Sequence, residues 1–156
     1  MQNPTPPADL PSAPAALAER QRVLAADLLG LDHPPADNLD ILRVVRGRLS
    51  LQAVSALQAV GLDTRTLDRI IPRRTLEHRR QKGEALTLEE SERAYRAASI
   101  VALAQAVFGN RDKALSWLHA PRSRFDGEAA IALIDTDIGA RLVEEALIQI
   151  DDGYFA

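Results

Sequence analysis

The chain has 156 residues, of which 46% are hydrophobic and 26% charged, and its formal net charge is −3 at pH 7. That length suffices for one core, or for two small modules that share one. Cysteine is absent, which excludes disulfides and thiolate metal sites and indicates a reducing, cytoplasmic compartment. Since no apolar run approaches the roughly 20 residues that cross a bilayer, we expect no membrane partner.

Residues 1–13, MQNPTPPADLPSA, form a proline-rich opening segment, and five of the nine prolines fall within the first fourteen residues. This composition predicts an extended, disordered tail. The alternative is a proline-rich ligand for a partner domain, but PTPPADLP contains no basic residue that would support such binding.

Helical periodicity starts at residue 14. Leucines three or four residues apart predict a first helix that ends at Gly30, after which HPPADN interrupts the pattern. Two short amphipathic helices follow, and the second is expected to open at Ser50 and close at Gly61. Asp63 caps the next predicted helix. An Ile-Pro step at residues 71–72 then leads into a basic helix that ends at Lys82-Gly83.

The longest predicted helix begins at a capping box formed by Thr87 and Glu90 and ends at Gly109-Asn110. Its apolar residues increase toward the end until they occupy most faces, which indicates more than one neighbour. The short helix KALSWLHAP, the loop RSRFDG and two last helices, GEAAIALI and GARLVEEALIQI, complete the chain. Because no stretch alternates with period two, the predicted fold class is all-α.

Positive charge is concentrated in one block. Residues 41–83 carry ten basic and three acidic side chains, a net +7, whereas the rest of the chain carries −10. A block of this kind focuses positive potential on one surface and attracts polyanions. The two predicted helices within residues 63–83 are joined by a tight turn, as in a helix-turn-helix whose second helix reads DNA.

The second of these helices, PRRTLEHRRQKG, supplies the candidate DNA contacts. Its N-terminal end is where base edges are usually reached, and the planar fork of arginine suits both the guanine edge and phosphate. The predicted DNA-binding residues are Arg65, Arg69, Arg73, Arg74, Thr75, His78, Arg79 and Lys82. The alternative is a solvated cationic face, and the lack of acidic partners beyond Glu77 argues against it.

The C-terminal part of the chain has three aromatic features. Trp117 is interpreted as a core anchor that joins two modules, or as an interface hot spot. Phe125, beside Arg122 and Arg124, is either a core residue or a partner contact. The terminal DDGYFA docks on its own core, on a second copy, or in a partner's cleft, where its carboxylates would meet basic groups that grip a nucleotide phosphate.

Catalysis is not indicated. The three histidines are scattered without metal-ligand spacing, and no G-x-S-x-G, P-loop or G-x-G-x-x-G is present. Paired carboxylates such as Glu144-Glu145 are adjacent in sequence, so on a helix they point about 100° apart. We therefore expect no enzymatic activity, no cofactor and no metal site.

Six short motifs occur in an ordered series: RRTL, LTLEESER, FG, WL, GARLV and the terminal GYFA. In this order they resemble the Xre/MbcA/ParS class of antitoxins, and most closely the Xre antitoxins paired with RES-domain toxins, from about residue 41 to the last residue. The sequence departs from the usual pattern at Pro72, where the family commonly has a capping serine, and at Asp126, where a glycine is usual.

The resemblance implies an Xre-like helix-turn-helix domain, here residues 14–110, and a small helical toxin-binding domain, here residues 111–156. It further implies a type II antitoxin that covers the active site of a NAD-degrading RES toxin and, with that toxin, represses its own operon. The implied toxin-binding residues are Trp117, Arg122, Phe125, Asp151, Asp152, Gly153, Tyr154, Phe155 and Ala156.

The alternative function is a stand-alone, dimeric helix-turn-helix regulator. A homodimer is expected in either case, because one helix-turn-helix reads only half of a two-fold operator, and the antitoxin reading adds a higher toxin–antitoxin complex. The predicted dimer surface combines the long helix with the C-terminal helices, including Ile138, Leu142 and Leu147.

Overall fold

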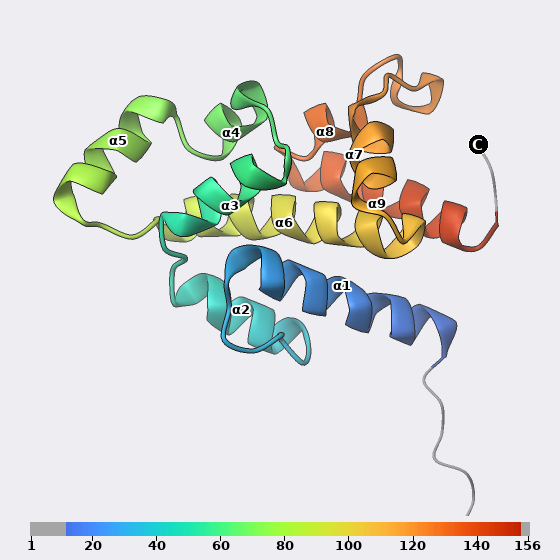
Figure 1. Ribbon diagram of the computed structural model, residues 1–156, viewed down its shortest axis with the longest axis horizontal. Helices are drawn as coiled ribbons and strands as arrows, with labels where there is room; N and C mark the ends of the chain where they lie inside the picture. The colour runs from blue at the N-terminus through green and yellow to red at the C-terminus, as the bar shows by residue number, and fades with distance from the viewer. Residues whose placement is uncertain (1–11, 154–156) are drawn as a thin grey trace, which may run out of the picture.

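The computed structural model describes residues 12–153, and this part of the chain is helical with short connections (Figure 1). Its elements are α1 (Ala13–Leu29), α2 (Asn38–Arg46), α3 (Gln52–Val60), α4 (Thr64–Ile70), α5 (Arg73–Lys82), α6 (Leu88–Phe108), α7 (Arg111–His119), a 3₁₀ turn (Ser123–Phe125), α8 (Ala130–Leu133) and α9 (Asp137–Asp151). Within residues 12–153 the β structure is limited to an isolated bridge between Pro121 and Ala129. The all-α prediction is confirmed; the predicted tail falls almost entirely outside the described residues.

Side-chain caps set the starts of five helices. Asp63 accepts from the Thr66 amide at 2.8 Å, and Thr87 forms a complete capping box with Glu90, as predicted. Three further caps are Asp37 on α2, Asn110 on α7 and Thr136 on α9. Asn110 was expected only to end the long helix, but its side chain also starts the next one, accepting from the Lys113 amide at 2.9 Å.

Two boundaries differ from the predicted ones. Helix α3 begins at Gln52 after Leu51, so Ser50 does not cap it. The segment GEAAIALI forms only the single turn of α8, because Thr136 caps a new helix three residues after α8 ends. The predicted ends at Gly30, Gly83 and Gly109 are confirmed, each glycine taking the left-handed conformation.

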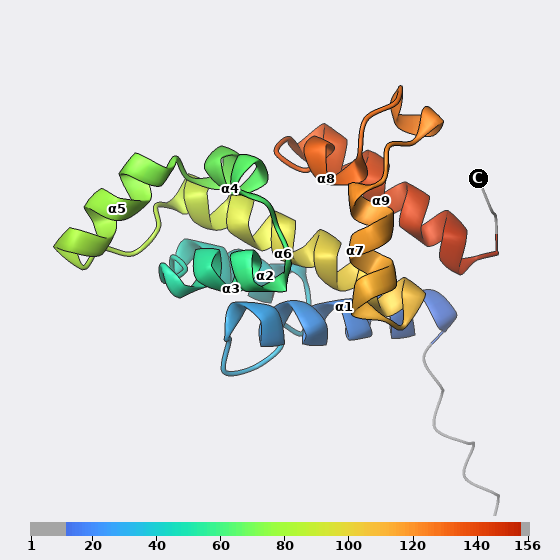
Figure 2. The ribbon, with the colours of Figure 1, turned by 45° about the horizontal axis from the view of Figure 1, so that its top comes forward.

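Helix α6 lies at the centre of the fold (Figures 1 and 2). Helix α1 packs along it, α2 and α3 contact it as well, and α7 and α9 lie against it from the other side. Its buried residues are Glu90, Ser91, Ala94, Tyr95, Ala97, Ala98, Ile100, Val101, Ala102, Leu103, Ala104 and Ala106. Six of these twelve are alanines, and such small side chains allow neighbouring helices to approach closely. The predicted crowding of this helix is confirmed.

The core is continuous along the chain. Buried side chains from Leu17 in α1 to Leu147 in α9 belong to one cluster that includes Leu57, Leu86 and Val101. The N-terminal and C-terminal parts therefore share α6 as a common element, and they are not separated by a linker.

Gly139 fixes the packing of α8 on α9. It is buried in the first turn of α9, where its amide donates to Thr136 Oγ1 at 3.0 Å. A Cβ at this position would overlap the carbonyl oxygen of Leu133 and lie 2.9 Å from Thr136 Oγ1. Because one of these atoms belongs to the backbone, the neighbour cannot rotate away, and only glycine fits.

We expect Gly139→Ala to lower the free energy of unfolding by about 2–3 kcal/mol, since the new methyl group must displace the end of α8. Chemical denaturation followed by circular dichroism measures this change. Gly47→Ala is the matched control, because Gly47 has φ −70° and its nearest neighbour would lie 3.3 Å from the new Cβ. Equal effects of the two substitutions would contradict the packing role of Gly139.

Candidate functional site

The turn between α4 and α5 is two residues long. Ile71 is extended and almost completely buried, 1% exposed, so it attaches the turn to the core. Pro72 follows as the N-cap of α5 with φ −56° and ψ 136°, and it supplies no side-chain hydrogen bond. Arg93 Nε of α6 donates to the carbonyl of Ile70 at 2.9 Å, which satisfies the end of α4. The geometry is that of two short helices joined at a tight, anchored turn.

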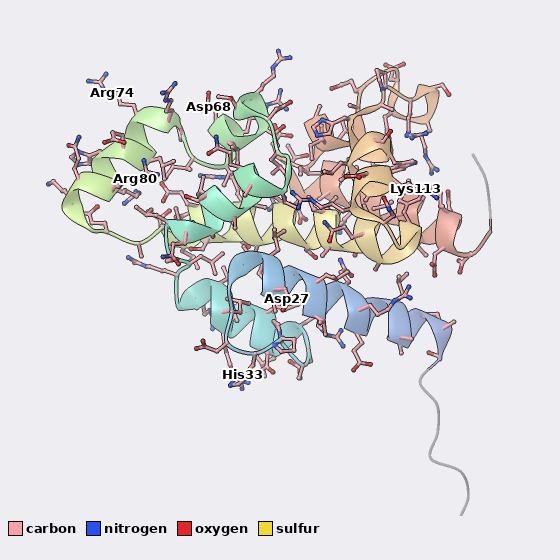
Figure 3. All side chains as sticks on the ribbon, viewed as in Figure 1. Asp27, His33, Asp68, Arg74, Arg80 and Lys113 are labelled. Carbon is pink, nitrogen blue, oxygen red and sulfur yellow. The ribbon has the colours of Figure 1, made fainter. Side chains whose placement is uncertain are left out.

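Helix α5 extends from one end of the molecule (Figures 1 and 2). No side chain within α5, all of which the structure describes, is buried. Arg73, Arg74 and His78 line one shallow hollow on its surface. The side chain of Arg74 points away from the body of the protein (Figure 3). Lys82 is also exposed, whereas Thr75 is half-buried.

Arg79 is held differently from its neighbours. Its side chain is 19% exposed and contacts two carboxylates, Glu84 at 3.3 Å and Glu90 at 3.0 Å. Arg80, a further basic residue of α5, pairs with Glu77 at 3.2 Å. The expectation that Glu77 alone offers acidic partners to this helix is therefore wrong. Glu90 was not found from the sequence because it lies eleven residues beyond Arg79, on another helix.

Arg65 and Arg69 face the C-terminal part of the chain, away from the hollow on α5. Both line a polar cavity of about 350 Å³ between α4, α7 and α8, together with His119 and Glu128. Arg69 Nη1 also donates to the carbonyl of Ala132 at 2.7 Å and lies 3.3 Å from Asp135. The structure thus divides the predicted DNA-binding residues between an exposed group on α5 and a junction group on α4.

One carboxyl at this junction has a shifted pKa. The amide of Thr66 donates to Asp63 and holds the pKa of that carboxyl below its ordinary value; the charges of His119 and Arg65 add smaller effects in the same direction. Asp63 therefore remains ionised as the cap of α4 over the physiological pH range.

The two C-terminal aromatic residues of interest are buried. Trp117 is 8% exposed and Phe125 is 7% exposed, and their rings meet edge-on with centroids 6.3 Å apart. Phe108 of α6 also packs on Trp117, with ring centroids 6.0 Å apart. Arg122 covers the indole at 4.7 Å, and burial lowers the pKa of this guanidinium, with a further contribution from the charge of Arg124. Trp117 thus joins α6, α7 and the 3₁₀ turn.

The turn after Phe125 explains one departure from the family pattern. Asp126 has φ +56°, in the left-handed region where glycine is favoured, and Gly127 follows with φ +85°. Aspartate tolerates this region better than most other residues, so the turn forms without the usual glycine. Asp126 and Gly127 are exposed.

The end of α9 presents charge, and its start presents apolar surface. Asp151, Asp152 and Gly153 are exposed; Tyr154, Phe155 and Ala156 lie outside the described residues. Ile138 is 75% and Leu142 47% exposed.

Leu147, predicted to share the apolar surface of Ile138 and Leu142, is completely buried, so that part of the predicted dimer surface is wrong. Nearby, burial raises the pKa of Glu144, although the charge of Arg141 opposes the shift.

Two family models match the chain: the antitoxin Xre-like helix-turn-helix domain over residues 40–99, and the antitoxin Xre/MbcA/ParS C-terminal toxin-binding domain over residues 103–153. The chain belongs to the Xre/MbcA/ParS antitoxin family. The first match ends and the second begins inside α6, the helix that both parts of this chain share. The helix-turn-helix match includes α4 and α5, and the toxin-binding match includes Trp117, Phe125 and the exposed end of α9.

Two curated relatives are similar to this antitoxin. The protein named Antitoxin Xre of Pseudomonas putida strain KT2440 is 46% identical over 87 residues, which is 56% of this chain and 55% of the relative, so the match spans about half the length of that protein. The protein named Antitoxin Xre of Yersinia enterocolitica strain 8081 is 27% identical over 120 residues, covering 76% of this chain and 75% of the relative.

Among residues 12–153, no three or more histidine, aspartate or glutamate side chains are grouped so that they would hold a metal ion. In the same part of the antitoxin, each helix is too short or too polar to pass through a lipid bilayer.

Proposed function

We propose that this antitoxin neutralises a RES-type, NAD-degrading toxin and, together with it, represses its own operon. The observation that carries the proposal is the separation of two exposed, oppositely charged ends. The cationic helix α5 and the acidic end of α9 lie at opposite ends of the long axis of the molecule (Figures 1 and 2). DNA and a toxin would thus be bound at the same time without competing for one surface.

The toxin side of the proposal rests on the exposed end of α9. Asp151 and Asp152 are the last carboxylates among the described residues, and they precede Gly153 and residues 154–156 in the sequence. A site that binds NAD must offer cationic or amide donors to the two phosphates. An acidic segment would meet the same donors and so occupy the site in place of the dinucleotide. Because Trp117 and Phe125 are buried, we propose that they support this surface from within. Arg122 and the chain end would then make the contacts with the toxin.

The DNA side rests on α5. Arg73 and Arg74 stand at its first turn and His78 lies one turn further on the same surface, where a helix in the major groove approaches base edges. Lys82 in the last turn is exposed and placed for a phosphate contact. We assign operator contact to this group. Arg65 and Arg69, which face the junction with α8, are secondary candidates.

The dimer that a two-fold operator requires is assigned to the exposed apolar residues of α9. Ile138 and Leu142 are one helical turn apart and therefore lie on the same face. Two large apolar side chains that are 75% and 47% exposed, side by side, are unusual on a surface that remains in water. We propose that a second copy of the chain covers them.

The toxin proposal predicts the behaviour of a chain that lacks residues 151–156. Co-expression of the intact antitoxin with the neighbouring gene should preserve growth and cellular NAD, whereas the shortened chain should not. Its thermal unfolding midpoint should remain close to that of the intact chain, because Asp151 and Asp152 are exposed. Protection by the shortened chain would contradict the proposed role of the terminus.

The same co-expression separates the alternative functions. A toxin that co-purifies with the intact antitoxin supports neutralisation by a complex, and failure of any neighbour-encoded protein to co-purify favours a stand-alone regulator. If the neighbouring gene alone leaves the NAD level unchanged, the assignment to the RES type is wrong.

The operator proposal predicts that Arg74→Ala weakens binding to the upstream DNA about tenfold at low salt. If Arg74 contacts phosphate, the slope of log K against log salt concentration should fall in magnitude by about 1. If Arg74 contacts a base, that slope should stay unchanged. Lys113→Ala removes the same charge from α7, far from α5 (Figure 3), and should change the affinity less than about twofold. Equal losses from both variants would indicate general electrostatic attraction and no reading by α5.

The dimer proposal predicts that Ile138→Asp shifts the antitoxin from dimer to monomer in sedimentation equilibrium, because the new carboxylate would be buried without a partner. Val23→Asp on α1 is the control, since Val23 is also exposed, at 40%. The monomeric variant should bind a single half-site but lose the added affinity for a two-fold operator. If Ile138→Asp forms a dimer as stable as that of the unaltered chain, the interface lies elsewhere.

A further inference from the structure

We propose that Arg79 and Glu90 form a positioning pair, which sets the orientation of α5 on α6 so that the N-terminal residues of α5 meet DNA. Arg79 then acts on the operator indirectly, although it belongs to the cationic helix. This inference rests on the proposed role of α5 in DNA binding and adds to it the part that fixes the geometry of the reading helix.

Helix α5 has few attachments to the rest of the antitoxin. All of its ten residues are described, and none is buried. Its entry is fixed by the buried Ile71, and Leu76 is half-buried against the core. Its C-terminal half continues through the exposed Gly83 and Ala85 before the chain returns to the core at Leu86. A helix attached mainly at its first turn would change its angle easily, so a contact near its C-terminal end decides its direction.

Arg79 supplies that contact. Its Nη2 donates to Glu90 Oε1 at 3.1 Å. Its Nε lies 3.0 Å from Glu90 Oε2, close enough for an ion pair, but the N–H is not aligned for a second hydrogen bond. Nη1 reaches Glu84 at 3.3 Å. The side chains of Arg79 and Glu90 are 19% and 8% exposed, so water screens this pair far less than the exposed pair of Arg80 and Glu77.

Glu90 is itself fixed to the centre of the fold. Its Oε2 accepts the amide of Thr87 at 2.8 Å, and Thr87 Oγ1 accepts the amide of Glu90 at 3.2 Å, which completes the capping box of α6. The next residue, Ser91, is fully buried and accepts the amide of Leu49 at 2.9 Å. The carboxylate that binds Arg79 therefore belongs to α6, the central helix of the fold.

The pair thus fixes the orientation of α5 relative to α6. Arg73 and Arg74 precede Arg79 by less than two helical turns, so a tilt of α5 about its anchored first turn re-aims both side chains. When the pair is absent, α5 samples several orientations and only a fraction of molecules is competent to bind, which weakens the apparent affinity by that fraction. The contacts made in the bound state remain the same.

Glu90→Gln tests this inference because electrostatics and positioning predict opposite changes in the affinity for DNA. The substitution removes a negative charge near α5, so charge alone would tighten DNA binding. Glutamine also serves at this position of a capping box, so α6 keeps its start. We expect about tenfold weaker binding to the upstream DNA, in line with the loss of a charged hydrogen bond, with an unchanged salt slope.

Glu89→Gln is the matched control, with the same charge change at the adjacent, exposed residue of α6. It should bind the same DNA as tightly as the unaltered antitoxin, or more tightly. A Glu90→Gln variant that behaves like Glu89→Gln would overturn the inference.

Amide hydrogen exchange on the DNA-free protein gives a second readout. In Glu90→Gln, amides of residues 73–82 should exchange several-fold faster while those of α9 remain unchanged. Unchanged exchange in α5 overturns the inference even if the DNA proposal holds. If the unaltered antitoxin binds no upstream DNA, the operator proposal fails, and the exchange experiment still decides whether the pair orders α5.

Arg79→Gln covers the case in which Glu90→Gln does not fold. A direct phosphate contact by Arg79 would lower the magnitude of the salt slope by about 1. Positioning instead predicts weaker binding with the slope retained, together with faster exchange in residues 73–82. A lowered slope with unchanged exchange would assign Arg79 to the DNA and overturn its role as a positioning residue.

Discussion

The close packing of helices on α6 is the constraint on which the other features depend. Alanines at 94, 97, 98, 102, 104 and 106 are buried in this helix, so α1, α7 and α9 approach it without large side chains between the backbones. The buried leucines of these neighbours each contribute about 1.5–3 kcal/mol; they are Leu17, Leu29, Leu118 and Leu147. Because α6 runs through both family matches, this packing makes a single body of the parts that match the helix-turn-helix domain and the toxin-binding domain.

The motifs that carry the family resemblance are mostly parts of this packing. In LTLEESER, Glu90 caps α6 and holds Arg79, Ser91 accepts the amide of Leu49, and Arg93 satisfies the end of α4. Trp117 of WL and Gly139 of GARLV are likewise buried packing residues. The resemblance therefore identifies the fold. The exposed members of these motifs, such as Arg73 and Arg74 of RRTL, are the residues to which the proposed function assigns partner contacts.

This distinction also explains which features the sequence predicts. The caps at Asp63 and Thr87 and the glycine ends are local, decided within four residues, and they are found correctly. The Arg79–Glu90 pair joins two helices and leaves no local signal. Leu147 was grouped with Leu142 because both are apolar, but five residues on a helix correspond to about 500°, or 140° around the axis, which turns Leu147 into the core. DNA and toxin contacts depend on absent partners and therefore remain predictions.

The distribution of charge follows from the same architecture. A chain with net charge −3 keeps a +7 block attractive to DNA only if its acidic residues are kept away from the reading surface. The antitoxin does this in two ways. The acidic end of α9 lies near the opposite end of α6. Because α6 has 21 residues, it is about 30 Å long, which exceeds the screening length of about 8 Å at physiological salt. The nearby Glu84 and Glu90 are engaged by Arg79. Glu77 lines the hollow on α5 together with Arg73, Arg74 and His78, but it is paired with Arg80. Two arginines of the cluster, Arg79 and Arg80, thus neutralise nearby carboxylates, one of which, Glu90, also caps α6.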